Sequence, residues 1–103
     1  ASQPVRLEGT VSRVEWTNPH AWFYVRVADP AGHVVLWAIE ATAPNALARR
    51  SLRLENVPPG VRVIVSGYRA KNGTPTARGV HLTLPDGRTV SLGSPETGAR
   101  DPK

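Results

Sequence analysis

The segment from His20 to Glu40 constrains the fold most, because small or apolar residues occupy every second position along much of it. Such alternation is typical of β-strands with one buried face, since successive side chains of a strand point to opposite sides. The sequence Asp29-Pro30-Ala31-Gly32 divides the segment, with Pro and Gly at positions that favour a tight turn. We therefore predict a β-hairpin with strands at His20–Asp29 and His33–Glu40.

The register of this hairpin follows from its apolar residues. If Gly32 is the bulged residue of a type I turn, Asp29 faces His33 and the apolar residues of both strands share one face. A register shifted by one residue would expose Val35, Trp37 and Ile39 and would bury less apolar area. The predicted core pairs are Val27 with Val35, Val25 with Trp37, and Phe23 with Ile39. The predicted outward pairs are Arg26 with Leu36, Tyr24 with Ala38, and Trp22 with Glu40.

The remaining segments predict further strands and one short helix. Val5–Trp16 is a long strand whose alternation slips near Ser12-Arg13, as a β-bulge would produce, and Gly9 marks a bend or a close backbone approach. Thr42–Arg50 favours a helix, capped by Thr42 or Ala43, because Pro44 suits the first helical position. The last three predicted strands are Val61–Ala70, Thr76–Leu84 and Arg88–Leu92.

Three strands, a short helix and two or three strands is the element order of an OB-fold. We predict an all-β protein: a small OB-like, five- to six-stranded, partly open barrel with one short helix between strands three and four. The rival architecture, a meander sandwich, would not need a helix there. The predicted core residues are Leu7, Val11, Val14, Phe23, Val25, Val27, Val35, Trp37, Ile39, Leu47, Val63, Val65, Val80 and Leu82.

Length and composition limit the chain to one domain and exclude several kinds of site. Of its 103 residues, we expect 1–92 to form a single OB-like barrel domain and 93–103, which lack apolar anchors, to form a mobile tail. The absence of Cys and Met excludes disulfides, thiolate sites and thioether ligands. No apolar run is long enough for a transmembrane helix. The net charge of +5 comes from scattered residues, which favours a solvated basic surface.

Short motifs extend over residues 9–92. They are W-T-N-P-H-A-W from Trp16, P-N-A-L-x-R from Pro44, P-P-G-V-x-V-x-V-x-G-Y from Pro58, N-G-T-P-T-A from Asn72, and L-P-D-G-R from Leu84. By these motifs the chain resembles a family of small exported bacterial proteins of unknown function. The resemblance implies a periplasmic or secreted OB-like domain whose signal peptide has been removed, and it implies no activity. Arg50-Ser51-Leu52 departs from the Gly-Trp of that family, which weakens any role for the helix end.

The expected function is noncatalytic binding in the bacterial cell envelope. The sequence contains no Ser/His/Asp spacing, nucleophile elbow or Gly-rich phosphate loop, so we expect no enzyme and no cofactor. An aromatic and basic outer face on the second and third strands, near the first hairpin, is unusual for a solvated surface. We expect it to bind a small molecule or an envelope protein. The candidate ligand-binding residues are Asn18, His20, Trp22, Tyr24, Arg26, Glu40, Asn45 and Tyr68.

Two alternatives use the same face. His20 and Glu40 are types that bind a cation, although zinc and copper sites usually have three or four ligands. Aromatic and basic residues such as Trp22 and Arg26 also resemble the single-stranded nucleic-acid surface of OB-folds, a partner that export would make unfavourable.

Plainer structural roles stay open for three of these residues. His20 can bond the turn backbone, Asn18 can form the turn with Pro19, and Asn45 can cap its neighbours.

Overall fold

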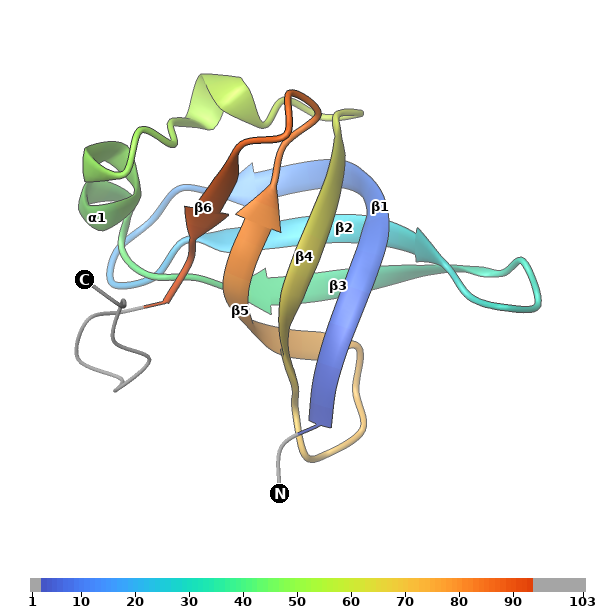
Figure 1. The fold of residues 1–103 in the computed structure, drawn as a ribbon. Helices are drawn as coiled ribbons and strands as arrows, with labels where there is room; N and C mark the ends of the chain where they lie inside the picture. Colours follow the sequence, from blue (N-terminus) through green and yellow to red (C-terminus); the bar gives the residue numbers. More distant parts are fainter. Residues whose placement is uncertain (1–2, 94–103) are drawn as a thin grey trace.

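The structure, a computed structural model, describes residues 3–93, which form six strands, one α-helix and one 3-10 turn (Figure 1). The strands are Gln3–Glu15 (β1), Trp22–Ala28 (β2), Val34–Glu40 (β3), Arg62–Arg69 (β4), Thr76–Thr83 (β5) and Thr89–Ser91 (β6), and the helical elements are Pro44–Arg49 (α1) and Leu54–Asn56 (η1). This confirms the predicted all-β class with a short helix between β3 and β4. Apart from Gly93, the predicted tail 93–103 lies outside the described residues.

The sheet curls around β1 into a partly closed barrel (Figure 1). The first part of β1, Gln3–Thr10, pairs antiparallel with β4, and the second part, Gly9–Glu15, pairs antiparallel with β2. The ladder continues from β2 to β3 on one side and from β4 through β5 to β6 on the other. A short parallel pairing of β3 with β5 joins the two sides and closes the barrel.

The bend in β1 has the two causes that its sequence predicts. The β1–β2 register shifts between Val11 and Arg13, which confirms the bulge. At Gly9, where β1 pairs with both neighbours, a Cβ atom would overlap the carbonyl oxygen of Arg26 on β2. A residue with a side chain would therefore push the two backbones apart.

The β2–β3 hairpin has the predicted register, with Val25 opposite Trp37 and Trp22 opposite Glu40. Its turn closes through the N–H of Asp29, which donates to the carbonyl oxygen of His33 at 2.7 Å. Gly32 adopts a φ of +89°, the left-handed region that glycine tolerates best. The hairpin extends beyond the barrel as an arm (Figure 1).

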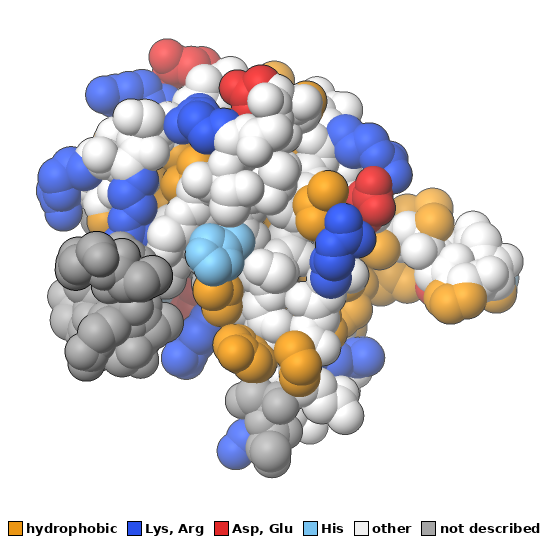
Figure 2. All heavy atoms as spheres, viewed as in Figure 1, with side chains coloured by type: hydrophobic (Ala, Val, Ile, Leu, Met, Phe, Trp, Pro, Cys, Tyr) orange, Lys and Arg blue, Asp and Glu red, His pale blue; other side chains and the backbone are white. Residues whose placement is uncertain are grey.

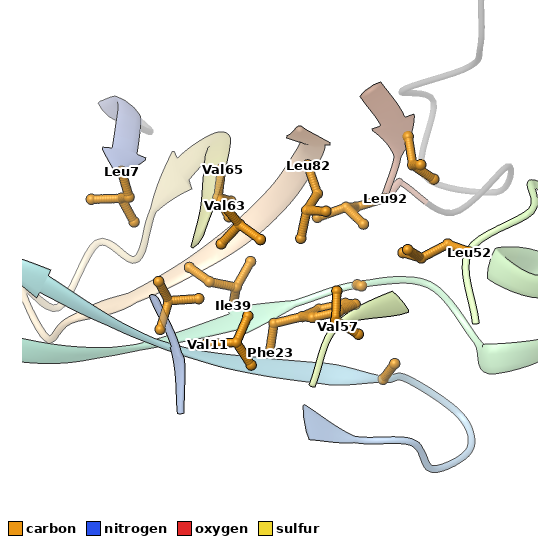
Figure 3. Packing of buried hydrophobic residues seen from close by; sticks show 14 of the residues in the cluster. Leu7, Val11, Phe23, Ile39, Leu52, Val57, Val63, Val65, Leu82 and Leu92 are labelled. Carbon is orange, nitrogen blue, oxygen red and sulfur yellow. The ribbon is translucent and has the colours of Figure 1, made fainter. Parts of the chain in front are cut away.

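The core fills the inside of the barrel. Figure 3 shows Val11, Phe23 and Ile39 facing Val63, Val65 and Leu82 across it. The segment after α1 adds Leu52 and Val57, which close one end. Nearly all predicted core positions are confirmed as buried or packed against the core. The fully buried large residues are Phe23, Ile39, Leu47, Leu52, Leu82, Leu92, Val11, Val25, Val57, Val63 and Val65.

Val80 corrects the prediction, because it is only half-buried and is not part of the core. The β4–β5 register shifts at Ser66, which leaves Val80 as an extra residue between the paired Gly79 and His81. Such a bulge reverses which face alternate residues occupy. The buried residues of β5 and the turn after it are accordingly Ala77, Gly79, Leu82 and Leu84.

α1 lies against one end of the barrel (Figure 1), where Leu47 is fully buried. The N-cap of α1 is Ala43, one of the two predicted candidates, and it makes no side-chain capping bond. Pro44 begins the helix, as predicted. The guanidinium of Arg50, just after the helix, donates to the carbonyl oxygens of Ser91 and Gly93 at 2.8 Å each. In residues 3–93, no helix has the length and apolar character needed to cross a membrane.

Candidate functional site

The connection between β1 and β2 places His20 beside the end of β3. It contains a cis peptide bond after Asn18, and the hydroxyl of Thr17 donates to the carbonyl oxygen of His20 at 3.3 Å. The N–H of Ala21 then donates to the carbonyl oxygen of Thr42 at 3.1 Å, which fixes the connection to the chain that leaves β3. Asn18 itself is exposed in the turn.

His20 and Glu40 form a close pair. The Nδ1 atom of His20 lies 2.7 Å from Oε2 of Glu40, and the two side chains are 44% and 30% exposed. Glu40 also lies opposite the half-buried Trp22, as predicted. Because Nδ1 faces a carboxylate rather than the turn backbone, the ring is oriented by Glu40, and Nε2 is the nitrogen left for a ligand.

Barrel closure extends this pair into a row across the sheet. The β3–β5 pairing sets Glu40 opposite Arg78, and the β4–β5 pairing sets Arg78 opposite Tyr68. Residues directly opposite on neighbouring strands point to the same face. Trp22, Glu40, Arg78 and Tyr68 therefore follow one another on the outer face, and together with His20 we call them the seam site.

Gly79 allows β5 to come this close to β3. A Cβ atom at this position would lie 2.7 Å from Cδ1 of Leu92 and 2.9 Å from Cγ2 of Ile39. Both distances are shorter than carbon atoms normally approach without bonding. A larger residue at position 79 would therefore open the seam.

Two pockets flank Glu40 and Arg78. The larger has a volume of about 370 Å³ and is also lined by Tyr68, Arg69 and Lys71. The smaller, of about 50 Å³, includes His20. Both are open to solvent, and Glu40 and Arg78 form the wall that they share.

The cations of the larger pocket differ in their bonding. Arg69 already has two partners within the protein. It donates to the carbonyl oxygen of Gly73 at 2.7 Å, and its guanidinium carbon lies 5.1 Å from the ring centre of Trp37. Arg78 and Lys71, in contrast, form no ion pair with any residue from 3 to 93. As far as the described residues go, Arg78 and Lys71 are therefore free to meet a ligand, while Glu40 faces His20.

Five predicted site residues line neither pocket: Asn18 and Trp22, described above, and Tyr24, Arg26 and Asn45. The hydroxyl of Tyr24 donates to Oε1 of Glu15 at 3.3 Å, and the guanidinium carbon of Arg13 lies 4.0 Å from its ring centre. Arg26 is exposed opposite Leu36 on the arm. Asn45 is exposed on α1, and its side chain bonds to none of the described residues.

Arg13 and Glu15 form a charged pair that holds Tyr24. Nη1 of Arg13 lies 2.7 Å from Oε2 of Glu15. This hydrogen bond lowers the pKa of the Glu15 carboxyl and raises the pKa of the Arg13 guanidinium. The ring of Tyr24 is thus occupied by neighbouring side chains, in contrast to the 47% exposed Tyr68.

A metal ion would find two protein ligands at the seam site. Among the described residues, no group of three or more His, Asp or Glu side chains is arranged to hold one. Nδ1 of His33 lies 3.6 Å from a carboxylate oxygen of Asp29, at the far end of β3. His81 is exposed on β5 opposite Ser66.

Arg78 and Lys71 are the site residues that sequence reasoning missed. The predicted strand Thr76–Leu84 places Val80, Leu82 and Leu84 on the inner face, and without a bulge the same alternation puts Arg78 inside as well. The bulge at Val80 turns Arg78 outward. The sequence did contain a sign of this bulge, because regular alternation would bury the charge of Arg78, and an unpaired charge is rarely buried.

One comparison with known proteins identifies a family. The model of a family of unknown function, DUF6152, matches residues 1–80, and the chain therefore belongs to this family. The matched span contains all five residues of the seam site. A search of curated proteins found no match.

Proposed function

We propose that this member of the DUF6152 family is a noncatalytic binding domain of the bacterial cell envelope, with an OB-like barrel that binds a small anion at the seam site. The observation that carries the proposal is that Arg78 and Lys71, without ion pairs among the described residues, line one pocket beside Tyr68. A guanidinium presents a planar set of donors that matches a carboxylate or a phosphate. The Tyr68 ring adds an apolar surface next to these charges.

The His20–Glu40 pair supports the specificity of such a site. Nδ1 of His20 lies 2.7 Å from one carboxylate oxygen of Glu40. The charge of Glu40 is therefore shared between His20 and Arg78, and Glu40 does not fully neutralise Arg78. Its second oxygen can accept a hydrogen bond from a hydroxyl or amino group of the ligand. We therefore propose an organic acid that also carries a hydrogen-bond donor.

The test is native mass spectrometry of the protein isolated from the envelope fraction of its own cells. We expect a small acid to copurify with the wild-type chain and to be lost from Arg78→Ala. Arg26→Ala is the matched control, because Arg26 is also an exposed, outward-facing Arg but lies outside the pockets. Equal ligand retention in Arg78→Ala and wild type, or no bound mass at all, would contradict the proposal. Recovery from the cytoplasmic fraction would contradict the envelope location.

The 2.7 Å contact of His20 with Glu40 favours a second candidate, the binding of Cu(II) or Zn(II) through Nε2 of His20. Calorimetry at neutral pH would then show heat for wild type, His33→Ala and His81→Ala, and none for His20→Ala. No heat and no shift in melting temperature with either ion would remove this candidate.

Calorimetry with a single-stranded oligonucleotide tests the nucleic-acid alternative. We expect single-stranded oligonucleotide to bind only weakly, with a steep loss of affinity as salt rises, because a net charge of +5 alone provides nonspecific attraction.

A further inference from the structure

The first part of β3 has an open edge. β3 pairs with β2 along Val34–Glu40 but with β5 only at Ala38–Glu40. The N–H of Ala38 points to the β5 side, where it donates to the carbonyl oxygen of Pro75 at 2.9 Å. Backbone groups of alternate residues point to the same side of a strand. The N–H and C=O groups of Val34 and Leu36 therefore point to this open side, where no strand among residues 3–93 pairs with them.

Pro75 cannot extend this pairing by another rung. In a parallel ladder that sets Ala38 opposite Thr76, the next rung would need the N–H of residue 75 to donate to the carbonyl oxygen of Leu36. A proline has no N–H. The open edge of β3, Val34–Trp37, therefore begins where the β4–β5 turn and Pro75 end the pairing.

The side chains along this edge are apolar and exposed. Val34 is 65% and Leu36 is 47% exposed, and both point outward from the arm. Figure 2 shows hydrophobic side chains on this arm, away from the body of the barrel. Unpaired backbone groups beside exposed apolar side chains are a template for an added strand.

The charges around the edge select the partner. Arg26 is exposed beside Leu36, and Arg69 lies over the ring of Trp37. Asp29, the acidic residue of the turn, already accepts hydrogen bonds from the N–H groups of Ala31 and His33. A second copy of this chain would bring the same basic residues and another net charge of +5, which repels.

We propose that the open edge of β3 accepts an extended acidic segment of a partner protein as an added strand. Backbone hydrogen bonds would form with Val34 and Leu36, and apolar side chains of the segment would lie beside theirs. In an alternating segment the carboxylates would then point to the opposite face of the strand, where Arg69 lies over the ring of Trp37, while Arg26 adds to the positive potential of the outer face. This surface does not require the ligand proposed for the seam site.

The test uses a short synthetic peptide that alternates glutamate and valine, and a counterpart that alternates lysine and valine. NMR of the full chain measures hydrogen exchange at Val34 and Leu36. We expect slower exchange there with the glutamate peptide, weaker binding as salt rises, and no binding of the lysine peptide. Equal binding of both peptides, or no protection of these amides at millimolar peptide, would overturn the proposal. So would protection that increases with protein concentration alone, because it would assign the edge to a second copy.

Two variants locate the binding. Leu36→Pro removes an N–H that the β2 ladder does not use, so the arm keeps its fold while peptide binding is lost. Leu36→Glu leaves the backbone intact and places a negative charge against the acidic peptide, which we expect to weaken binding by about tenfold or more. Leu54→Glu is the matched control, since Leu54 on η1 is 46% exposed. Equal affinity of Leu36→Glu and Leu54→Glu would show that the peptide binds elsewhere.

Discussion

Both ends of β3 pair with β2 along one edge, but their opposite edges have different neighbours and their outer faces carry different side chains. At Ala38–Glu40 the strand meets β5, and the outer face carries the charged and aromatic seam site. At Val34–Trp37 the edge is open and the outward side chains are Val34 and Leu36. Two residues contribute to the difference: Gly79 on β5 leaves room for the approach to β3, and Pro75, in the turn before β5, has no N–H to continue the pairing. A single strand can therefore present two kinds of surface when its neighbour covers only half of it.

Removing the core beneath both ends has the largest expected effect. Phe23 is fully buried opposite Ile39, so Phe23→Ala should lower the free energy of unfolding by about 3–5 kcal/mol. Urea denaturation measures the loss, and Leu54→Ala on the exposed side of η1 is the control with little effect. A Phe23→Ala variant that melts within a degree or two of wild type would mean that the faces of β2 are reversed.

Opening the seam alone should have an intermediate effect. Gly79→Val adds atoms where Leu92 and Ile39 already lie, which typically costs about 1–3 kcal/mol. Hydrogen exchange at Ala38 should then approach the rate at Leu36, while exchange at Trp37, which pairs with β2, should stay slow. If Ala38 stayed protected in this variant, the approach of β5 would not depend on Gly79.

Extending the seam should change stability little and binding more. Pro75→Ala restores an N–H that can donate to Leu36, a gain of about 0.5–1.5 kcal/mol that the greater freedom of the unfolded chain offsets by about 0.4–1 kcal/mol. The acidic peptide should bind this variant more weakly than wild type, because part of the open edge is now paired. Unchanged peptide affinity would argue that Leu36 is not a contact. Titration of the wild-type and variant chains under the same conditions measures this.

The charged pair that holds Tyr24 provides the smallest effect, at a place remote from the open edge. Arg13→Gln removes the hydrogen bond that lowers the pKa of Glu15, so that pKa should rise toward its ordinary value. Because the folded pKa is depressed, the stabilisation is present above the unfolded pKa and is lost as the pH falls through the folded one. NMR titration of the Glu15 carboxyl measures the shift. The same titration curve in wild type and Arg13→Gln would show that the hydrogen bond is not made in solution.

The sequence predicted what local alternation controls. The β2–β3 register and the bulge in β1 are both visible as the phase of apolar residues, and both are confirmed. The predicted alternation of β5 is wrong on the N-terminal side of Val80. The bulge lies between two segments that each alternate regularly, so the sequence pattern does not reveal it. That one-residue error also hid Arg78, since it assigned the residue to the inner face.

The site was predicted in part for a related reason. Trp22, Glu40 and Tyr68 were selected from the outer faces of the second to fourth predicted strands, and the structure places them in one row with Arg78. His20 lies beside Glu40, next to this row. The partner that joins them, Arg78, comes from a strand that is distant in sequence. Local patterns do not specify which edges meet when a sheet closes. Nor did they show that Tyr24 would be occupied by Arg13 and Glu15, which lie across a bulge.

The parallel pairing of Ala38 with Thr76 also implies an order of events during folding. The hairpin of β2 and β3 joins neighbouring segments, whereas closure must first bring distant ones together, and the entropy of long loops makes such contacts slow to form. We therefore expect the edge at Val34 and Leu36 to exist before the pocket around Arg78 does. Pulse-labelling hydrogen exchange during refolding should protect Val35 and Trp37 earlier than Ala38. A partner strand could then meet this chain before any small ligand can.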